Sequence, residues 1–460
     1  MIDNSLKFVE LREKYKEFIF EDYSVNEDDN YIYLNFKFSI PNLKDFSPNI
    51  KIKKKDYIKI STKNNITANK LAFHIGLVEL ISYWKCTCSP NVIIKCGNLD
   101  DNQIEWFKKL YFYGLGELFY QNNIHTTIKE FMNIKTIGTT VEEDSNIKEN
   151  DYNGYIIPIG GGKDSVVTIE NIPLKEDDYC LIINPKPVTL DCAKVSGFKD
   201  NNIIEIERKI DIGLIELNSL GFINGHTPFS SLLAFISYFV AYLTNKKYIA
   251  LSNESSANES NVLGEKINHQ YSKSYEFEND FYNYTKKYLQ IPIKYFSFLR
   301  PLNELQIAKL FSKYEKYHKI FKSCNVGSKE KEWKWCCKCP KCLFVYTILS
   351  PFLYKEKLLN IFGNDLFEDK ELLETFIELA GYGKTKPFEC VGTFEEVKFA
   401  ISTTIENIER KNEKLPYLLQ YYKDNFKLVD LSIDITKRYN NTNNLTEELN
   451  NILKEAIFSD

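Results

Sequence analysis

The feature that most restricts the fold of this 460-residue chain is a glycine-rich segment about a third of the way along it. The apolar run Tyr155–Ile159 leads into Gly160, Gly161 and Gly162, and a helical pattern begins within the next few residues. Glycines let the backbone approach a ligand closely, and a helix start offers free N–H groups and the positive end of the helix dipole. This order of strand, glycine loop and helix predicts a phosphate-binding turn in an α/β fold. A tight turn without a ligand is the alternative.

The residues after the glycines supply the groups that a bound nucleotide needs. Lys163 adds a positive charge, Ser165 adds a hydroxyl, and Asp164 adds a carboxylate suited to Mg²⁺. The spacing is neither that of a Walker A loop nor that of G-x-G-x-x-G. The loop resembles the Ser-Gly-Gly-x-Asp-Ser loop of the N-type ATP pyrophosphatases, or PP-loop enzymes, with Gly160 in place of their first serine. The resemblance implies that ATP binds here and is cleaved to AMP and pyrophosphate.

Strand and helix patterns alternate around this loop, as they do in a parallel sheet with helices on both faces. We therefore expect residues 150–350 to form a PP-loop catalytic domain of Rossmann-like, parallel-sheet α/β type. The expected strands are Tyr155–Ile159, Tyr179–Asn184, Ile203–Ile206, Tyr248–Ser252 and Ile293–Leu299, and the expected helices include Phe229–Leu243 and Glu304–Tyr317. Residues 351–460 have a mostly helical pattern.

Residues 1–145 have the pattern of a separate α+β domain, to which we assign substrate recognition. The expected elements are strands at Tyr31–Phe38 and Ile50–Ile60, helices at Ala68–Trp84 and Gln103–Gln121, and a polar linker at Glu142–Asn153. The lysines Lys53–Lys55 could mark a nucleic-acid patch. We interpret them instead as charges that protect a solvated edge strand.

Five of the eleven cysteines are clustered in the C-terminal half of the chain. Cys324, Cys336, Cys339 and Cys342 supply four thiolates, enough for a closed tetrahedral zinc site, and Cys337 is spare. Such a site has no open position for a substrate, so its role would be structural. Reduced free cysteines and an iron–sulfur cluster are the alternatives. A similar four-cysteine element follows the PP-loop domain of the cyano-deazaguanine synthases, which implies the same pairing of features here.

Polar segments follow several of the expected strands, where α/β sheets bind their ligands. Glu254 and Glu259 come directly after an expected strand and suit magnesium binding or proton transfer. His226 and His269 lie in two other polar loops, where a buried structural histidine is an equally good interpretation. Arg300 offers a fork that could clamp a substrate carboxylate or a pyrophosphate.

Together these segments resemble the ATP-dependent UDP-N-acetylmuramoyl-L-alanyl-L-glutamate epimerases. Most specific are Asn-Glu-Ser-Ser-Ala-Asn-Glu at 253–259 and Pro-Phe-Glu-Cys-Val-Gly-Thr at 387–393. The resemblance covers most of the chain through the segments Leu71–Pro90, Ile157–Glu170, Gly225–Ala234, Tyr248–Asn261, Asn268–Glu278, Tyr295–Ile307, Cys324–Pro351 and Lys386–Glu396. It implies that ATP adenylates a substrate carboxylate, that the neighbouring Cα proton is removed and returned on the other face, and that water then releases AMP. The candidate acid and base groups are Glu254, Glu259, His226, His269, Lys273, Glu389 and Cys390.

The remaining features narrow the function further. A net charge of −4 gives no reason to expect nucleic acid or an anionic membrane as a partner. No apolar block is visible near Met1, and the longest apolar run, Phe229–Leu243, is too short to cross a bilayer. We therefore expect a cytoplasmic protein. An amide-forming or nucleobase-modifying PP-loop enzyme is the alternative, although Ile2 rather than a cysteine follows Met1, so a glutaminase-like nucleophile is missing there. A nucleotide- or zinc-binding module without catalysis is a third possibility.

Overall fold

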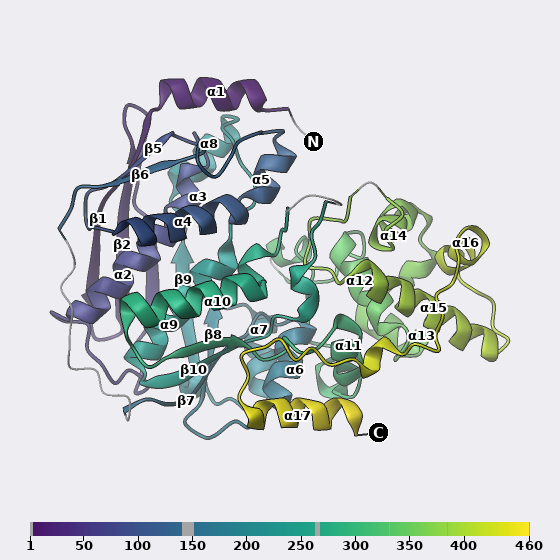
Figure 1. Ribbon diagram of the computed structural model, residues 1–460. Coiled ribbons are helices and arrows are strands. Elements are labelled where there is room, and N and C mark those ends of the chain that lie inside the picture. Colours follow the sequence, from purple (N-terminus) through teal and green to yellow (C-terminus); the bar gives the residue numbers. More distant parts are fainter. Residues whose placement is uncertain (1–2, 140–150, 263–266, 331, 384, 460) are drawn as a thin grey trace.

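One large sheet runs through the protein. The computed structural model describes residues 3–139, 151–262, 267–330, 332–383 and 385–459 (Figure 1). Its strands are β1 (Glu17–Glu27), β2 (Tyr31–Ile40), β3 (Lys44–Phe46), β4 (Asn49–Lys53), β5 (Asn91–Ile94), β6 (Asn133–Thr136), β7 (Asn153–Pro158), β8 (Tyr179–Ile183), β9 (Ile203–Lys209), β10 (Lys246–Leu251) and β11 (Lys294–Ser297). Among the described residues these eleven strands follow the order β11-β10-β7-β8-β9-β4-β2-β1-β5-β6, and β3 pairs with β2. Strands β7 to β11 are mutually parallel, β5 is parallel to β1 and β6, and the pairs around β2 and β4 are antiparallel. The expected α/β class with a mostly parallel sheet is confirmed.

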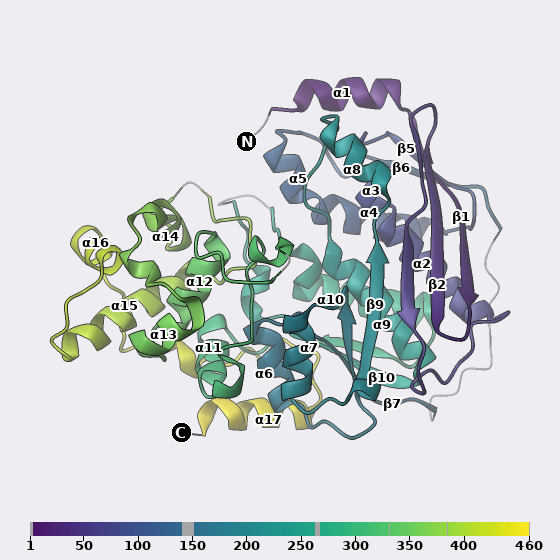
Figure 2. The same ribbon diagram turned by 180° about the vertical axis from the view of Figure 1, so that it is seen from behind.

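Helices cover both faces of the sheet and form a separate group beyond it. They are α1 (Ser5–Lys14), α2 (Ile66–Glu79), α3 (Ile81–Trp84), α4 (Asp101–Gly114), α5 (Gly116–Gln121), α6 (Lys163–Asn171), α7 (Pro187–Val195), α8 (Ile212–Ser219), α9 (Phe229–Leu243), α10 (Tyr275–Tyr284), α11 (Glu304–Ser312), α12 (Pro340–Leu349), α13 (Lys355–Phe362), α14 (Leu373–Leu379), α15 (Phe394–Arg410), α16 (Tyr417–Asn425) and α17 (Glu447–Phe458). Helices α12 to α16 lie together on the side away from β1 and β2 (Figures 1 and 2). The final helix α17 returns and packs against α6 and α11. Of the helices in the described part, none combines the length and hydropathy needed to cross a membrane.

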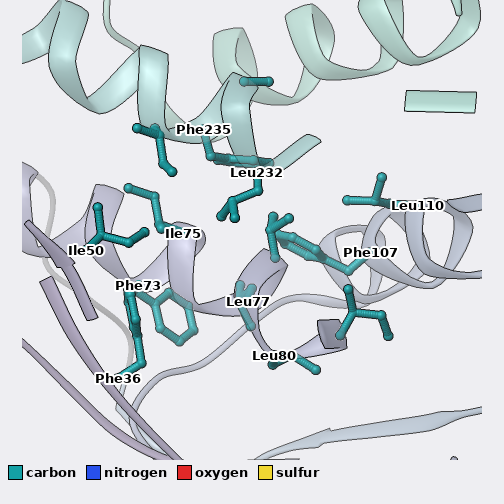
Figure 3. Close-up of a cluster of buried hydrophobic side chains, with 14 of the residues drawn as sticks. Phe36, Ile50, Phe73, Ile75, Leu77, Leu80, Phe107, Leu110, Leu232 and Phe235 are labelled. Carbon is teal, nitrogen blue, oxygen red and sulfur yellow. The ribbon is translucent and has the colours of Figure 1, made fainter. Parts of the chain in front are cut away.

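Two hydrophobic cores lie on opposite faces of the parallel strands. In β7, Ile156 belongs to one core and Ile157 to the other, and in β10 the same holds for Ile249 and Ala250. This follows from the two-residue period of a strand, and burial on both faces is typical of parallel sheets. The first core includes Phe73 of α2 and the facing residues of α4 and α9 (Figure 3). The second core joins the sheet to α6, α11 and α12.

The sheet is continuous between residues 1–145 and residues 150–350. Strand β4 pairs antiparallel with β9, so strands from both expected domains share one set of ladder hydrogen bonds. The interpretation of Lys53–Lys55 as charges on an edge strand is wrong, because β4 lies between β2 and β9. Lys53 and Lys55 instead contact Glu205 of β9, with nitrogen–oxygen distances of 2.9 and 3.7 Å. The strand expected at Ile50–Ile60 stops at Lys53 because the chain then turns and buries Tyr57.

Several elements differ in length from the expectation. The helix expected at Gln103–Gln121 breaks at Leu115 into α4 and α5, and a Cβ on Gly114 would lie 2.6 Å from Pro228. The helix expected at Ala68–Trp84 is divided between α2 and α3, and α11 stops at Ser312 before a short 3₁₀ turn. The expected linker at Glu142–Asn153 lies mostly outside the described residues. The boundaries at 145, 150 and 350 stay predictions.

A buried ion pair fastens α2 to β9, and its loss should destabilise the protein. Arg208 donates from Nε and Nη2 to the two carboxylate oxygens of Glu79, both at 2.9 Å, and the Glu79 side chain is 1% exposed. Glu79→Ala leaves the guanidinium buried without its partner, which we expect to cost about 3–5 kcal/mol in the free energy of unfolding. Urea denaturation measures this change.

The matched control is Glu176→Ala, which removes the partner of Lys199 from a pair whose side chains are 89% and 75% exposed. Exposed pairs of this kind contribute little to stability. Equal losses of stability in the two variants would contradict the assignment of Arg208 and Glu79 as a structural pair.

Candidate active site

The glycine loop has a backbone that needs glycine, because of one positive φ angle and one close neighbour. It connects the end of β7 to the start of α6, with Gly162 as the N-cap. Gly161 has φ of +79°, and a Cβ on Gly162 would lie 2.7 Å from the hydroxyl oxygen of Ser323. A Cβ on Gly160 would meet no atom within 4 Å. Two of the three glycines are therefore required by conformation or by space, whereas the position that differs from the PP-loop pattern would accept a serine.

A cavity of about 340 Å³ opens above this loop. It lies at the carboxyl ends of β7, β8 and β10, where open α/β sheets bind their ligands. Its lining includes Gly160, Gly162, Ser165, Lys273 and Cys390. The cavity therefore brings the glycine loop together with two of the candidate catalytic residues. A larger cavity, of about 510 Å³, lies among α12, α13 and α15, away from these residues.

Three carboxylates gather beside the start of α6. One oxygen from each of Asp164, Glu254 and Glu304 lies within 4.8 Å of the others. Lys163, expected to contact a phosphate, is buried and pairs with Asp164 and Glu304, so it does not belong to the lining of the cavity. Carboxylate oxygens at this spacing are the donor set that Mg²⁺ prefers. Glu259, expected to act together with Glu254, instead contacts Lys386, with 2.6 Å between the Lys386 nitrogen and a Glu259 oxygen.

The buried charges shift the two nearest carboxyls in opposite directions. Burial raises the pKa of Glu304 to about 8, although the positive charge of Lys163 opposes this shift. Burial also opposes ionisation of Asp164, but the charges of Lys163 and Lys341 outweigh it and hold the pKa of Asp164 below its usual range. Asp164 is therefore an anion at neutral pH, at the edge of the cavity.

Arg300 is fully buried behind the site and does not belong to the cavity lining. Its guanidinium donates to the backbone carbonyls of Glu254 and Lys273 at 2.7 and 2.6 Å, and it pairs with Glu278 at 3.1 Å. The arginine that we expected to clamp a carboxylate or a pyrophosphate thus holds together the two loops that carry Glu254 and Lys273.

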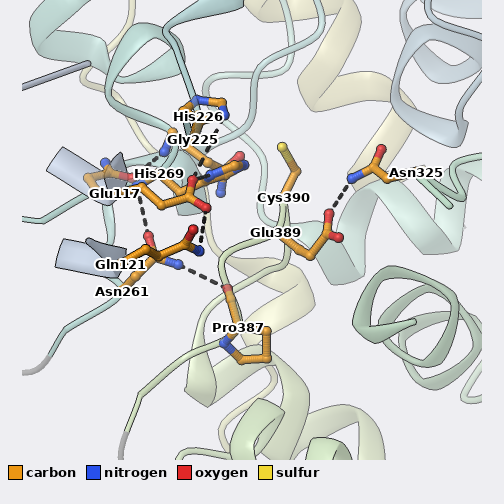
Figure 4. A network of polar contacts seen from close by, with 12 residues as sticks. Glu117, Gln121, Gly225, His226, Asn261, His269, Asn325, Pro387, Glu389 and Cys390 are labelled. Carbon is orange, nitrogen blue, oxygen red and sulfur yellow. Dashed lines mark hydrogen bonds and ion pairs between the residues drawn. The ribbon is translucent and has the colours of Figure 1, made fainter. Parts of the chain in front are cut away.

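A second cluster contains a thiol, a lysine, two histidines and a glutamate. Figure 4 labels four of them, Cys390, His226, His269 and Glu117. The Lys273 nitrogen lies 3.0 Å from the Cys390 sulfur. His269 Nδ1 contacts the carboxylate of Glu117, and the His269 ring and the Cys390 thiol shift each other's pKa. The ring of His226 lies 4.2 Å from that of His269, centroid to centroid, and its Nδ1 is 3.8 Å from Glu117. The loops around 226 and 269 therefore converge on Glu117 of α5.

The charges in this cluster favour a thiolate and an imidazolium. Burial alone would raise the pKa of Cys390, but the positive charge of Lys273 and the hydrogen bond from His269 lower it to about 6. Burial alone would lower the pKa of His269, but its hydrogen bonds with Cys390 and Glu117 raise it to about 9. For His226, burial and the neighbouring charge of His269 lower the pKa to about 3, so this ring is neutral.

The four cysteines Cys324, Cys336, Cys339 and Cys342 come together as expected. Their sulfurs are separated by 3.9 Å (324–339), 3.8 Å (336–342) and 3.5 Å (339–342). Zinc–sulfur bonds of about 2.3 Å in a tetrahedron give sulfur–sulfur distances of about 3.8 Å, so these thiols fit a zinc ion. The thiol of Cys337 instead donates to the Phe362 carbonyl at 3.2 Å.

The four-cysteine element also contacts the loop that carries Cys390. Lys341, between Cys339 and Cys342, donates to the backbone carbonyl of Cys390, and Asn325 donates to Glu389. Lys341 also lines the cavity over the glycine loop. A metal at these cysteines would therefore set the position of the Cys390 loop.

Sequence reasoning missed Glu117, Glu304 and Lys341. Glu117 is a charged residue between Leu115 and the apolar pair Leu118 and Phe119, and an acid in an apolar helical run is a usable signal. Glu304 follows the helix cap Asn303 and looks like an ordinary first-turn acid. Lys341 lies inside the cysteine motif, and nothing in its neighbours distinguishes it from a surface lysine.

The fold and the site define an α/β protein with a ligand cavity at the carboxyl ends of a mostly parallel sheet and a charged thiol cluster at its wall. The model of the MurL N-terminal domain matches residues 9–298, and that of the MurL C-terminal domain matches residues 320–427. The chain belongs to the MurL family.

Curated relatives show the same similarity over most of the chain. The UDP-N-acetyl-alpha-D-muramoyl-L-alanyl-L-glutamate epimerase of Xanthomonas oryzae pv. oryzae is 31% identical over 358 residues, which are 76% of this chain and 78% of that protein. Proteins with the same name from a Micromonospora species and from Salinispora tropica are each 32% identical, over 72% and 71% of this chain and 74% and 71% of their own lengths.

The charge environment of Cys390 predicts unusual reactivity toward alkylating agents. Because a thiolate reacts and a thiol does not, the rate of iodoacetamide labelling at Cys390 should rise with a midpoint near pH 6. Peptide mass spectrometry measures this rate. Lys273→Met removes the nearest positive charge and should move the midpoint toward the value of about 8.5 for an ordinary thiol. A wild-type midpoint already at that value would contradict the assignment.

Proposed function

We propose that this protein inverts the terminal L-glutamate of UDP-N-acetylmuramoyl-L-alanyl-L-glutamate to D-glutamate, with consumption of ATP, during peptidoglycan precursor synthesis. One observation carries the proposal: the cavity over the glycine loop is also lined by Cys390 and Lys273. Activation of a carboxylate and proton transfer at the adjacent carbon can therefore occur in one site. The names of the curated relatives support the choice of substrate.

The need for ATP follows from the acidity of the carbon to be inverted. Removing the Cα proton next to a free carboxylate would produce an enolate dianion, so that proton is hardly acidic. Transfer of AMP from ATP to the α-carboxylate removes the charge, makes an activated acyl group and releases pyrophosphate. A base of ordinary strength then takes the proton, a second group returns it on the opposite face, and water releases the carboxylate and AMP.

The two clusters have different roles in the proposed reaction. Backbone N–H groups of the glycine loop and the hydroxyl of Ser165 bind phosphate oxygens. Asp164, Glu254 and Glu304 hold Mg²⁺, which when bound neutralises phosphate charge. The groups that move protons belong to the second cluster, His226, His269, Lys273 and Cys390. Glu259 acts through its pair with Lys386, which holds the loop leading to Cys390 in place.

We further propose that the four-cysteine element holds a structural zinc ion. Elemental analysis of the purified protein should find about one zinc per chain. Cys336→Ser should remove most of the metal, since it deletes one ligand. Cys337→Ser is the matched control and should keep the metal, since Cys337 contacts the Phe362 carbonyl instead. Equal metal loss in both variants would contradict this ligand set.

The decisive experiment uses ATP, Mg²⁺ and the UDP-muramoyl dipeptide in heavy water. We expect AMP, pyrophosphate and D-glutamate that carries deuterium at Cα. Asp164→Asn should lower the rate by about 100-fold or more, since it removes a charge that positions the nucleotide. Asp191→Asn on the exposed side of α7 is the control and should not change the rate.

Other results of this experiment would indicate a different function or contradict the proposal. Pyrophosphate without inversion would favour the alternative of an adenylating enzyme that forms amides or modifies a nucleobase. Formation of neither pyrophosphate nor D-glutamate would contradict the proposal. With H₂¹⁸O, label in AMP but not in the α-carboxylate would contradict acyl hydrolysis as the last step.

A further inference from the structure

Cys390, His269 and Glu117 come together from three distant parts of the chain. His269 contacts the Glu117 carboxylate through Nδ1, and the His269 ring and the Cys390 thiol shift each other's pKa. Glu117 is itself almost fully buried, and a buried carboxylate is costly unless it is paired. Enzymes that use covalent catalysis combine a nucleophile with a base and with a third group that orients the base.

The surroundings of these three residues are held in place by a buried amide. Asn261 accepts from the backbone N–H of His269 at 2.9 Å and donates to the carbonyl of Pro387 at 3.0 Å. The backbone N–H of Lys386 donates to the carbonyl of Asn261 at 3.0 Å. The loop with the histidine and the loop with the thiol are therefore tied to the same residue, and the distance between the two groups is fixed.

The position of the thiol matters as much as its partners. Cys390 lines the cavity that also contains the glycine loop, so an acyl group activated by ATP in that cavity lies within the same enclosure as the sulfur. Lys273, 3.0 Å from the sulfur, stabilises the thiolate that must attack. His226, which is neutral, lies against His269.

We propose that Cys390 is a covalent nucleophile that takes the glutamyl acyl group from AMP, so that inversion occurs on an enzyme-bound thioester. This inference rests on the proposed ATP-dependent epimerisation and adds a step to it. A thioester suits that step because sulfur donates less electron density to the carbonyl than oxygen does. The Cα proton of a thioester is therefore more acidic than that of an oxygen ester.

The added step is balanced without an oxidant or a reductant. The thiolate of Cys390 attacks the acyl carbon of the adenylate, a carbon–sulfur bond forms, and the bond from that carbon to the phosphate oxygen breaks as AMP leaves. After the Cα proton has been removed and replaced, water adds to the thioester carbonyl. The carbon–sulfur bond then breaks, the oxygen of water stays in the carboxylate, two protons pass to solvent, and the thiolate is restored.

Acid quenching during turnover tests this proposal. With wild-type protein, ATP, Mg²⁺ and substrate, we expect a mass increase at Cys390 equal to that of the substrate minus one water, and its removal by hydroxylamine. Cys390→Ser should also collect an adduct, because an oxygen ester is hydrolysed more slowly than a thioester. Cys390→Ala should form no adduct and invert glutamate at least 100-fold more slowly. It should still catalyse substrate-dependent exchange of pyrophosphate into ATP within about twofold of wild type.

Cys96→Ala is the control, since Cys96 lies at the end of β5 and does not line the cavity. It should leave adduct formation and inversion unchanged. Wild-type exchange and inversion without an adduct in either wild type or Cys390→Ser would overturn the covalent step and leave Cys390 as an acid or base at Cα. Absence of pyrophosphate exchange in wild type would overturn the proposed function itself, and the two failures are therefore distinguishable.

Discussion

The arrangement of the site depends on one buried cation, the guanidinium of Arg300. Moving such a charge out of water costs several kcal/mol unless its donors are satisfied. Here Nη1 and Nη2 are satisfied by Glu278 and by the backbone carbonyls of Glu254 and Lys273, whereas the buried Nε has no hydrogen-bond partner among the described residues. Because those carbonyls belong to the residues whose side chains enter the two clusters, the contacts that stabilise the arginine also fix the carboxylate cluster relative to the thiol cluster.

The two clusters use charge in opposite ways. Beside the glycine loop, three carboxyl groups lie around one buried lysine, so their oxygens are available to a bound cation. Around Cys390, a lysine and a protonated histidine stabilise one thiolate, so an anion is favoured there.

Local sequence patterns predict most helices and strands, but they do not predict how these elements pair and pack. The helix Phe229–Leu243 agrees with α9 at both ends, and the four metal-type cysteines are close in space because only short segments separate them. The pairing of β4 with β9 joins residues about 150 positions apart, and no local pattern specifies a partner at that distance. The same limit applies to Glu117, whose role comes from histidines in two loops far along the chain. The residue type of Arg300 predicts a contact with a carboxylate or a pyrophosphate. Its burial instead leaves it to hold two loops together.

The return of α17 to the sheet has a consequence for how the protein is made. This helix, the last in the described chain, packs on α6, which begins at the glycine loop. A ribosome that has reached residue 446 has already synthesised every residue of both clusters, yet α6 still lacks its outer cover. At about 5–20 residues per second, that cover follows within a few seconds. The nascent chain thus contains every residue of its thiol cluster before the outer cover of the helix that begins at the glycine loop has been made.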